Sequence, residues 1–177
     1  PYIETITSTV IEGVYLVFSS CRINDENKQI DSGDSISMSL DIINAGSDDA
    51  SNIELTLTTD SEFVTMIDNT ASISSLTSGK KVTIDDEFSF VIADDVPDKT
   101  VINFKLVAAT ETESWENNFS VEANAPALAI SNVSISNNDD IIYPGETVVM
   151  KFEVRNEGGS TAHDVLAELS CRSNDIK

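Results

Sequence analysis

Basic residues, histidine and cysteine are all scarce in this chain. Its 177 residues include 10 Lys plus Arg, one His and two Cys, against 31 Asp plus Glu, and the formal net charge is −21. Such a surface repels phosphate backbones and anionic lipid headgroups, so we expect no binding to nucleic acid. No apolar run approaches the ~20 residues of a membrane-spanning helix, so no membrane insertion is expected either.

The residues that carry most enzyme chemistry are absent or badly spaced. His163 and Cys171 lie near opposite ends of one expected strand, ~27 Å apart if it is extended, which is beyond the reach of a Cys–His nucleophile. One His and two distant Cys also lack the spacing of zinc ligands. There is no Gly-rich phosphate loop and no Gly-x-Ser-x-Gly motif. We expect no catalytic residue in this chain, and no cofactor apart from the calcium considered below.

What the chain does contain is an internal repeat. Residues 30–60 align without a gap with residues 142–172, a spacing of 112 residues, and seven of the 31 positions are identical. The identical pairs are Ile30/Ile142, Gly33/Gly145, Met38/Met150, Asn44/Asn156, Gly46/Gly158, Ala50/Ala162 and Leu57/Leu169. A period of this length is too long for a solenoid and is about one β-sandwich domain.

The repeat predicts the domain organisation. We expect a complete module over residues 14–124 and the first part of a second module, truncated, over 126–177. Residues 1–13 are interpreted as the closing strand of a preceding module. Because the chain begins at Pro1 without an initiator Met, we expect it to be a fragment of a longer protein. Cys21 and Cys171 do not fall on equivalent repeat positions, so they are interpreted as small hydrophobic residues rather than a disulfide.

Alternating apolar residues predict the fold class. Residues 35–42 alternate strictly, as a strand with one buried and one solvated face requires, and residues 148–154 repeat the pattern. Seven or eight such strands with polar turns predict an all-β, immunoglobulin-like antiparallel β-sandwich. Val101 is expected to face inward on its strand, with Ile102 facing the other way or a bulge at Asn103. Residues 126–177 are expected to form three strands. The expected core comprises Ile36, Met38, Leu40, Ile42, Leu55, Leu57, Phe90, Phe104 and Trp115.

One turn of the first module has the composition of a calcium site. Asp25, Asn27, Asp31 and Asp34 precede the first alternating strand, and calcium takes six to eight oxygen ligands. The same residue types also form Asx-turns, which is the other interpretation of this turn. The only cofactor that the sequence suggests is therefore calcium.

The repeated segment resembles a known family. Tyr143-Pro-Gly-Glu-Thr-Val-Val-Met-Lys-Phe-Glu-Val-Arg-Asn-Glu-Gly158 and the matching stretch from Ile30 resemble CARDB-type immunoglobulin-like modules. The resemblance is to modules found C-terminal to the catalytic domain in secreted gingipain-like cysteine peptidases and subtilisin-like peptidases of Bacteroidetes. Ser32 stands where the family pattern has proline. No peptidase motif occurs in the chain, so the resemblance implies a module and no activity.

These observations favour a non-catalytic spacer or interaction module of a larger secreted or cell-surface protein, plausibly a peptidase. Its expected partners are other domains of the same polypeptide, with an extracellular protein or a glycan as further candidates. The alternative hypothesis is an adhesion or carbohydrate-binding module, for which several exposed aromatic residues are expected. The truncated second module predicts an uncovered apolar face. We expect a dimer, or pairing with the segment Tyr2 to Val10, to cover it.

Overall fold

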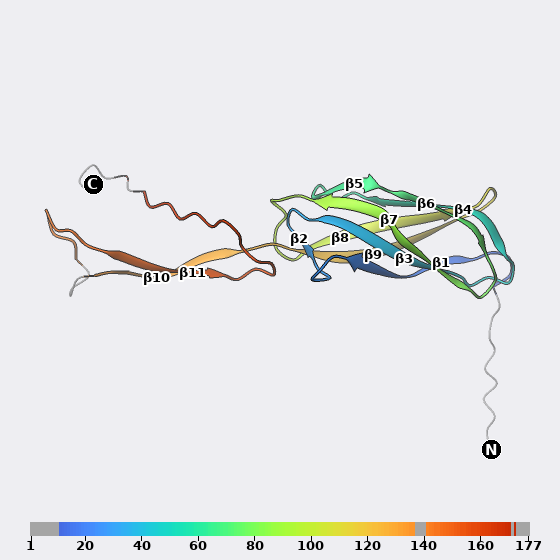
Figure 1. Ribbon diagram of the computed structural model, residues 1–177, viewed down its shortest axis with the longest axis horizontal. Helices are drawn as coiled ribbons and strands as arrows, with labels where there is room; N and C mark the ends of the chain where they lie inside the picture. The colour runs from blue at the N-terminus through green and yellow to red at the C-terminus, as the bar shows by residue number, and fades with distance from the viewer. Residues whose placement is uncertain (1–10, 137–140, 171, 173–177) are drawn as a thin grey trace, which may run out of the picture.

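The fold consists of a β-sandwich followed by a separate two-stranded ribbon. The computed structural model describes residues 11–136, 141–170 and 172, and these form strands and no helix. Figure 1 shows the ribbon extending from one end of the sandwich. The strands are β1 (Leu16–Asn24), β2 (Ile30–Asp31), β3 (Ser35–Asn44), β4 (Ala50–Thr59), β5 (Val64–Asp68), β6 (Thr70–Leu76), β7 (Lys81–Ile92), β8 (Thr100–Ala109), β9 (Ser114–Asn124), β10 (Leu128–Ile135) and β11 (Met150–Asn156). No described segment is a helix long and apolar enough to cross a membrane.

Two sheets form the sandwich. One has the order β1-β3-β7-β5 and the other β2-β9-β8-β4-β6, and every neighbouring pair except β2–β9 is antiparallel. Their inner faces enclose one hydrophobic cluster that draws on both sheets. Strand β3 from Ile36 to Ile42 and strand β4 from Ile53 to Leu57 place every second residue in this cluster, as their alternating sequences predict. The predicted all-β immunoglobulin-like sandwich is confirmed.

The predicted core is confirmed at eight of its nine positions, which are at most 2% exposed. Trp115 is the exception, because it is only partly buried and packs against the edge of the cluster. Beyond β9 lies only the two-residue strand β2, which pairs with Ala123 and Asn124 at the other end of β9. Trp115 therefore lies on an open sheet edge, where one side remains accessible to solvent.

The expected orientation of the β8 side chains was wrong at its start. Val101 is 58% exposed and Ile102 is 0% exposed, so Ile102 shares the inner face with Phe104. Strand β8 pairs with β9 from Thr100 to Ala109 without a bulge. The alternation is therefore unbroken along β8, and a regular register rather than a local irregularity decides which side chains point inward.

The expectation of three strands after residue 126 was also wrong. The described part of this region forms β10 and β11 only, and residues 157–170 are not in a strand. The equivalent segment of the sandwich is β4, which is hydrogen-bonded to β6 on one side and β8 on the other. Where neither neighbour is present, the backbone groups of an alternating segment have no ladder to join.

One charged side chain is buried on the outer face of the β1-β3-β7 sheet. Asp41 in β3 is 6% exposed and accepts hydrogen bonds from Thr83 Oγ1 at 2.6 Å, Lys81 Nζ at 2.9 Å and Ser20 Oγ at 2.9 Å. These bonds, with the Thr83 hydroxyl contributing most, hold the pKa of Asp41 well below its usual range. Asp41 thus connects the three strands through a carboxylate that stays ionised.

Candidate functional site

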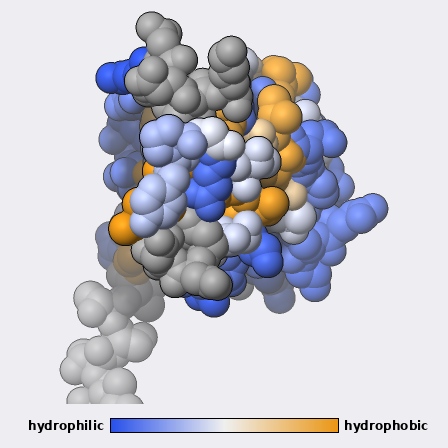
Figure 2. All heavy atoms as spheres, turned by 90° about the vertical axis from the view of Figure 1, so that its left-hand side faces the viewer, coloured by the Kyte–Doolittle hydropathy of each residue, from blue (hydrophilic) through white to orange (hydrophobic). Residues whose placement is uncertain are grey.

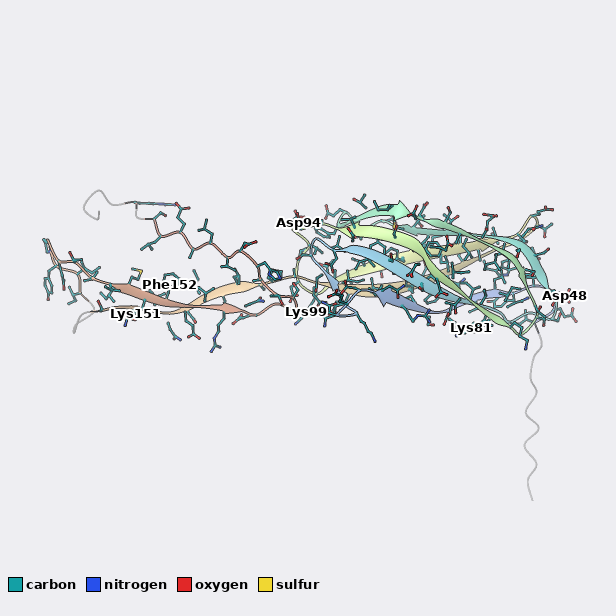
Figure 3. The ribbon with its side chains drawn as sticks, viewed as in Figure 1. Asp48, Lys81, Asp94, Lys99, Lys151 and Phe152 are labelled. Carbon is teal, nitrogen blue, oxygen red and sulfur yellow. The ribbon has the colours of Figure 1, made fainter. Side chains whose placement is uncertain are left out.

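The β10–β11 ribbon has one apolar face and one polar face. Ile130 pairs with Val154, and Ile135 pairs with Met150, across the two strands. Directly paired residues of an antiparallel ribbon point to the same side, and Met150 and Val154 also share a side because they lie four residues apart in β11, so these four side chains share a face. Lys151, between Met150 and Phe152 in β11, points to the other side, as Figure 3 shows. The ribbon therefore has the amphipathic pattern of a sheet that packs on a core.

Nothing described covers the apolar face. Ile130 is 67% exposed, Phe152 42% and Val154 41%. Figure 2, viewed from the ribbon end, shows hydrophobic side chains on the surface between hydrophilic ones. Further along the chain, Leu166 is 89% exposed and Leu169 is 73% exposed in the segment without strand structure. Apolar side chains exposed on one face of a strand pair are a common feature of interaction surfaces.

The ribbon repeats the hydrogen bonds of the sandwich strands 112 residues earlier. Asn44 Oδ1 accepts from Tyr15 N and Gly46 N, and Asn44 Nδ2 donates to Asp48 O. Asn156 makes the same three bonds, which are Ala127 N to Oδ1 at 3.0 Å, Gly158 N to Oδ1 at 3.1 Å and Nδ2 to Ser160 O at 2.7 Å. The backbone repeats as well, since Gly33 and Gly145 have φ values of 82° and 81°, and Asn52 and Asp164 have 52° and 49°.

The two asparagines differ in what surrounds them. Asn44 is completely buried and donates a fourth hydrogen bond to Leu76 O of β6, at 3.0 Å. Asn156 is exposed, and the described part of the second region has no strand in the position of β6. The hydrogen bonds within the turn therefore form in both regions, whereas other strands bury the asparagine only in the sandwich.

The four predicted calcium ligands lie together in the turn before β3. Asp25 Oδ2 accepts from Asn27 N, Asn27 Oδ1 accepts from Gln29 N, and Asp34 Oδ2 accepts from Asp31 N at 2.8 Å. The first two are the bonds that the Asx-turn interpretation predicts, because each side-chain oxygen accepts from the amide two residues later. The Asn27 amide also donates to Asp31 Oδ2 at 2.9 Å. Local hydrogen bonds thus hold all four residues in place.

Among the described residues, no ion pair joins Asp25, Asp31 or Asp34 to a basic side chain. Burial raises the pKa of Asp34, and the neighbouring carboxylates of Asp25 and Asp31 raise it further, against a hydrogen bond from the Asp31 amide. Asp31 Oδ1 is buried and has no hydrogen-bond partner among the described residues. No group of three His, Cys, Asp or Glu side chains within the described ranges is placed to hold a metal ion. Calcium would therefore need Asn27 and main-chain carbonyls as additional ligands, and its binding here stays a prediction.

The other residues singled out in the sequence are not brought together. His163 is exposed in the segment after β11, and Cys171 and the segment Tyr2 to Val10 lie outside the described residues. Cys21 is a free thiol in β1 that packs partly buried against the core, and burial raises its pKa. Cys21 therefore acts as a small hydrophobic residue, in agreement with its assignment from the sequence.

Sequence reasoning missed Asp98, which lies between the sandwich and the ribbon. Asp98 belongs to the loop between β7 and β8, and its Oδ1 accepts hydrogen bonds from Ala125 N at 3.0 Å and Gly159 N at 2.9 Å. These two bonds, the first from Ala125, lower its pKa. The repeat contains no signal for this residue, because position 98 has no counterpart within residues 126–177.

Comparison with known proteins identifies the family and adds no specific ligand. Residues 18–122, more than half of the chain, match the sequence model of the CARDB family. No curated protein matches the chain.

Among solved structures, native alpha-2-macroglobulin from Escherichia coli, from domain MG7 to the C-terminus, is similar with a TM-score of 0.44 at 12% identity. This match covers 66% of the present chain and 19% of that protein. Trypsin-activated alpha-2-macroglobulin from Escherichia coli gives the same TM-score at 16% identity, covering 68% of this chain and 8% of that one. The chain thus spans less than a fifth of the length of either structure.

Proposed function

The chain belongs to the CARDB family, and we propose that it serves as a non-catalytic spacer or interaction module within a longer secreted or cell-surface protein. The immunoglobulin-like fold of this family is a non-catalytic fold. The observation that carries the proposal is the β10–β11 ribbon, which repeats the bonds of β1 and β3 but leaves its apolar face open. In a chain of adjoining modules, this apolar face would be covered by the remaining strands of the second module.

In this proposal the sandwich is one module and the ribbon begins the next. Strands equivalent to β5–β9 would complete the second module and cover Phe152 and Val154. Residue 11 supports a module before the sandwich as well. Ile11 forms a parallel bridge with Gly46, ahead of the sandwich strands, and it is 42% exposed. Its repeat counterpart is Ala123, near the end of β9, which is buried.

The protein that contains these modules is proposed to be a secreted peptidase. The support is the resemblance of residues 143–158 to modules that follow peptidase domains, together with an acidic surface that disfavours nucleic acid. The partners would then be the neighbouring domains of the same polypeptide. The sequence of the gene around this segment tests the context, since a glycan-hydrolase domain upstream would contradict the peptidase.

The modular arrangement has a direct test. The chain would be produced with roughly 60 further residues, enough to complete a module of about 100 residues, and compared with the 177-residue chain. We expect the amides of β11 to become protected from hydrogen exchange to the level of β3 in the longer chain. Unchanged exchange at Phe152 and Val154 would contradict the proposal.

Binding of carbohydrate is less well supported by the surface. Tyr15, at 41%, is the one aromatic residue exposed in the described part of the sandwich. Phe18 and Phe119 stack on each other with ring centroids 4.4 Å apart, and Phe119 also stacks on Phe104. A sugar-binding surface normally presents several aromatic faces to solvent. The described part of the sandwich therefore lacks the several exposed aromatic residues that the adhesion or carbohydrate-binding alternative requires, and the two further exposed aromatic residues, Tyr143 and Phe152, lie after it in different segments.

A second candidate function is calcium binding by the turn of Asp25, Asn27, Asp31 and Asp34. Asp31 Oδ1, which has no hydrogen-bond partner among the described residues, favours this function because a bound cation would give it a ligand contact. The raised pKa of Asp34 also favours it, because a nearby cation would lower that pKa. We propose weak binding, which would raise the thermal midpoint in millimolar calcium above that in sodium chloride of equal ionic strength. Asp31→Asn should abolish the difference. Equal midpoints in the two salts would exclude the site.

A further inference from the structure

The connection between the sandwich and the ribbon is short and is crossed by hydrogen bonds. Residues 125–127 join β9 to β10, and the Ala125 amide at its start donates to Asp98 Oδ1 at 3.0 Å. The same oxygen accepts from Gly159 N at 2.9 Å. Asp98 comes from the β7–β8 loop of the sandwich, and Gly159 from the loop after β11. One carboxylate oxygen therefore connects a loop of the sandwich to a loop of the ribbon. In Figure 3 the neighbouring Lys99 and Asp94 mark this end of the sandwich.

The loop after β11 is also in close contact with residues 124–127. A Cβ atom built on Gly158 would lie 2.1 Å from Ala125 O and 2.5 Å from Ala127 N, and one built on Gly159 would lie 2.6 Å from Asn124 Oδ1. Real Cβ atoms do not approach backbone atoms this closely, so only glycine fits at position 158. The Glu157 amide adds a hydrogen bond to Ala127 O at 2.8 Å. The loop after β11 is thereby fixed against the linker.

The opposite end of the sandwich has the same backbone packing. A Cβ atom on Gly46 would lie 2.1 Å from Gly13 O and 2.6 Å from Tyr15 N, and the Ala45 amide donates to Tyr15 O at 2.8 Å. The Gly13 amide, which is the repeat counterpart of Ala125 N, donates there to Ser47 Oγ at 3.1 Å. The backbone packing between the linker and the glycine turn is therefore the same at both ends of the sandwich. The Asp98 carboxylate is the additional contact at the end that is joined to the ribbon.

We propose that Asp98 is a positioning residue that locks the angle between the sandwich and the β-unit that follows it, so that the connection is a rigid joint and not a flexible linker. The proposal rests on the modular function proposed above and specifies its mechanics. A spacer built in this way transmits orientation from one module to the next, because rotation about residues 125–127 would break the bond from Gly159 to Asp98, while the bond from Ala125 holds Asp98 at the start of the linker. The hydrogen bonds from the Ala125 and Gly159 amides lower the pKa of Asp98, and its charged carboxylate is a stronger acceptor for backbone amides than a neutral group.

The test measures relative orientation in the intact 177-residue chain by residual dipolar couplings of backbone amides. In the wild type, one alignment tensor should fit the sandwich strands and β10–β11 together. In Asp98→Ala, two tensors should be needed, and hydrogen exchange at the Ala125 and Gly159 amides should accelerate by roughly tenfold, as the loss of one hydrogen bond to each predicts. Asp98→Asn retains an acceptor oxygen and should stay close to the wild type.

Two further variants make the outcome specific. Asp95→Ala removes the same charge from an exposed position of the same loop and should leave a single tensor. Gly158→Ala should separate the tensors as Asp98→Ala does, through steric displacement instead of bond loss. A single tensor in Asp98→Ala, or two tensors in the wild type, would overturn the rigid joint while leaving the modular function standing. Absence of cross-strand contacts between Ile130 and Val154 in the wild type would overturn both.

Discussion

Strands β3 and β11 have the same alternating sequence and the same turn at their end, but opposite surroundings. Met38, Leu40 and Ile42 of β3 are at most 1% exposed, whereas their counterparts in β11 are at least 40% exposed. Both strands pair with a preceding strand and end in an asparagine that bonds to the same backbone groups. Strand pairing and turn geometry are therefore determined by local sequence. Burial is not, because it depends on strands from further along the chain.

The largest expected contrast is between the stability effects of substitutions at Leu40 and Phe152, which occupy equivalent positions of the repeat. Leu40→Ala removes a fully buried side chain and should reduce the free energy of unfolding by about 2–5 kcal/mol, through lost transfer energy and the remaining cavity. Phe152→Ala removes a side chain that is 42% exposed and should change it by less than about 0.5 kcal/mol. Denaturant unfolding, followed by the fluorescence of Trp115, measures both.

The same pair of substitutions can be repeated in a chain that extends through a complete second module. There Phe152→Ala should cost about 3–5 kcal/mol in the unfolding of that module. A loss below 1 kcal/mol for Leu40→Ala, or the same small loss for Phe152→Ala in both chains, would show that the comparison between β3 and β11 does not hold.

A smaller contrast is expected between the two turn asparagines. Asn44→Ala leaves the amides of Tyr15 and Gly46 without their acceptor inside a buried turn, which should cost about 1–3 kcal/mol. Asn156→Ala breaks equivalent bonds at an exposed position, where water replaces the lost partners. The thermal midpoint should therefore fall clearly for Asn44→Ala and hardly for Asn156→Ala. Equal shifts would indicate that the asparagine acts only through the turn.

The acidic residue at the middle of each strand gives a pH-dependent contrast. The folded-state pKa of Asp41 lies below its unfolded value, so its stabilising effect is present above about pH 4 and is lost as the pH falls through the folded pKa. Asp41→Asn should lower the stability by about 2 kcal/mol at pH 7 and progressively less below pH 4. Its counterpart Glu153 is exposed and bonds to Arg155, so Glu153→Gln should give a curve parallel to the wild type. Parallel curves for both variants would contradict the role of Asp41.

The weakest expected effect is self-association of the 177-residue chain. The open face of β10–β11 should pair with that of a second copy at high concentration, since a two-stranded sheet with an exposed apolar side is marginal in water. Sedimentation velocity should show a dimer that disappears in Phe152→Lys. A monomer at all concentrations with an ordered ribbon would contradict this expectation.

The repeat and the alternation predicted the sandwich and eight of the nine core residues, because period-two patterns report directly which face of a strand is buried. They could not predict that Trp115 is only partly buried. Its exposure depends on the position of β9 at the edge of the sheet, and the pattern of one strand does not encode the order of strands in a sheet. Asp98 was unpredictable for a related reason. Its partners are backbone amides that lie 27 and 61 residues away, and backbone groups leave no trace in a sequence. The calcium turn was predicted as a cluster, and its Asx bonds were the second interpretation offered for it.

The open apolar face of the ribbon has a consequence for how such a protein is made. In a tandem array synthesised from its N-terminus, each β10–β11 pair would leave the ribosome before the strands that cover it. At about 5–20 residues per second, roughly 60 further residues take about 3–12 s to appear. For that interval every new module would present a strip of valine, isoleucine and phenylalanine next to identical strips on neighbouring chains. A strong negative charge, carried through all the modules, would keep nascent chains of one polysome apart while each sandwich closes.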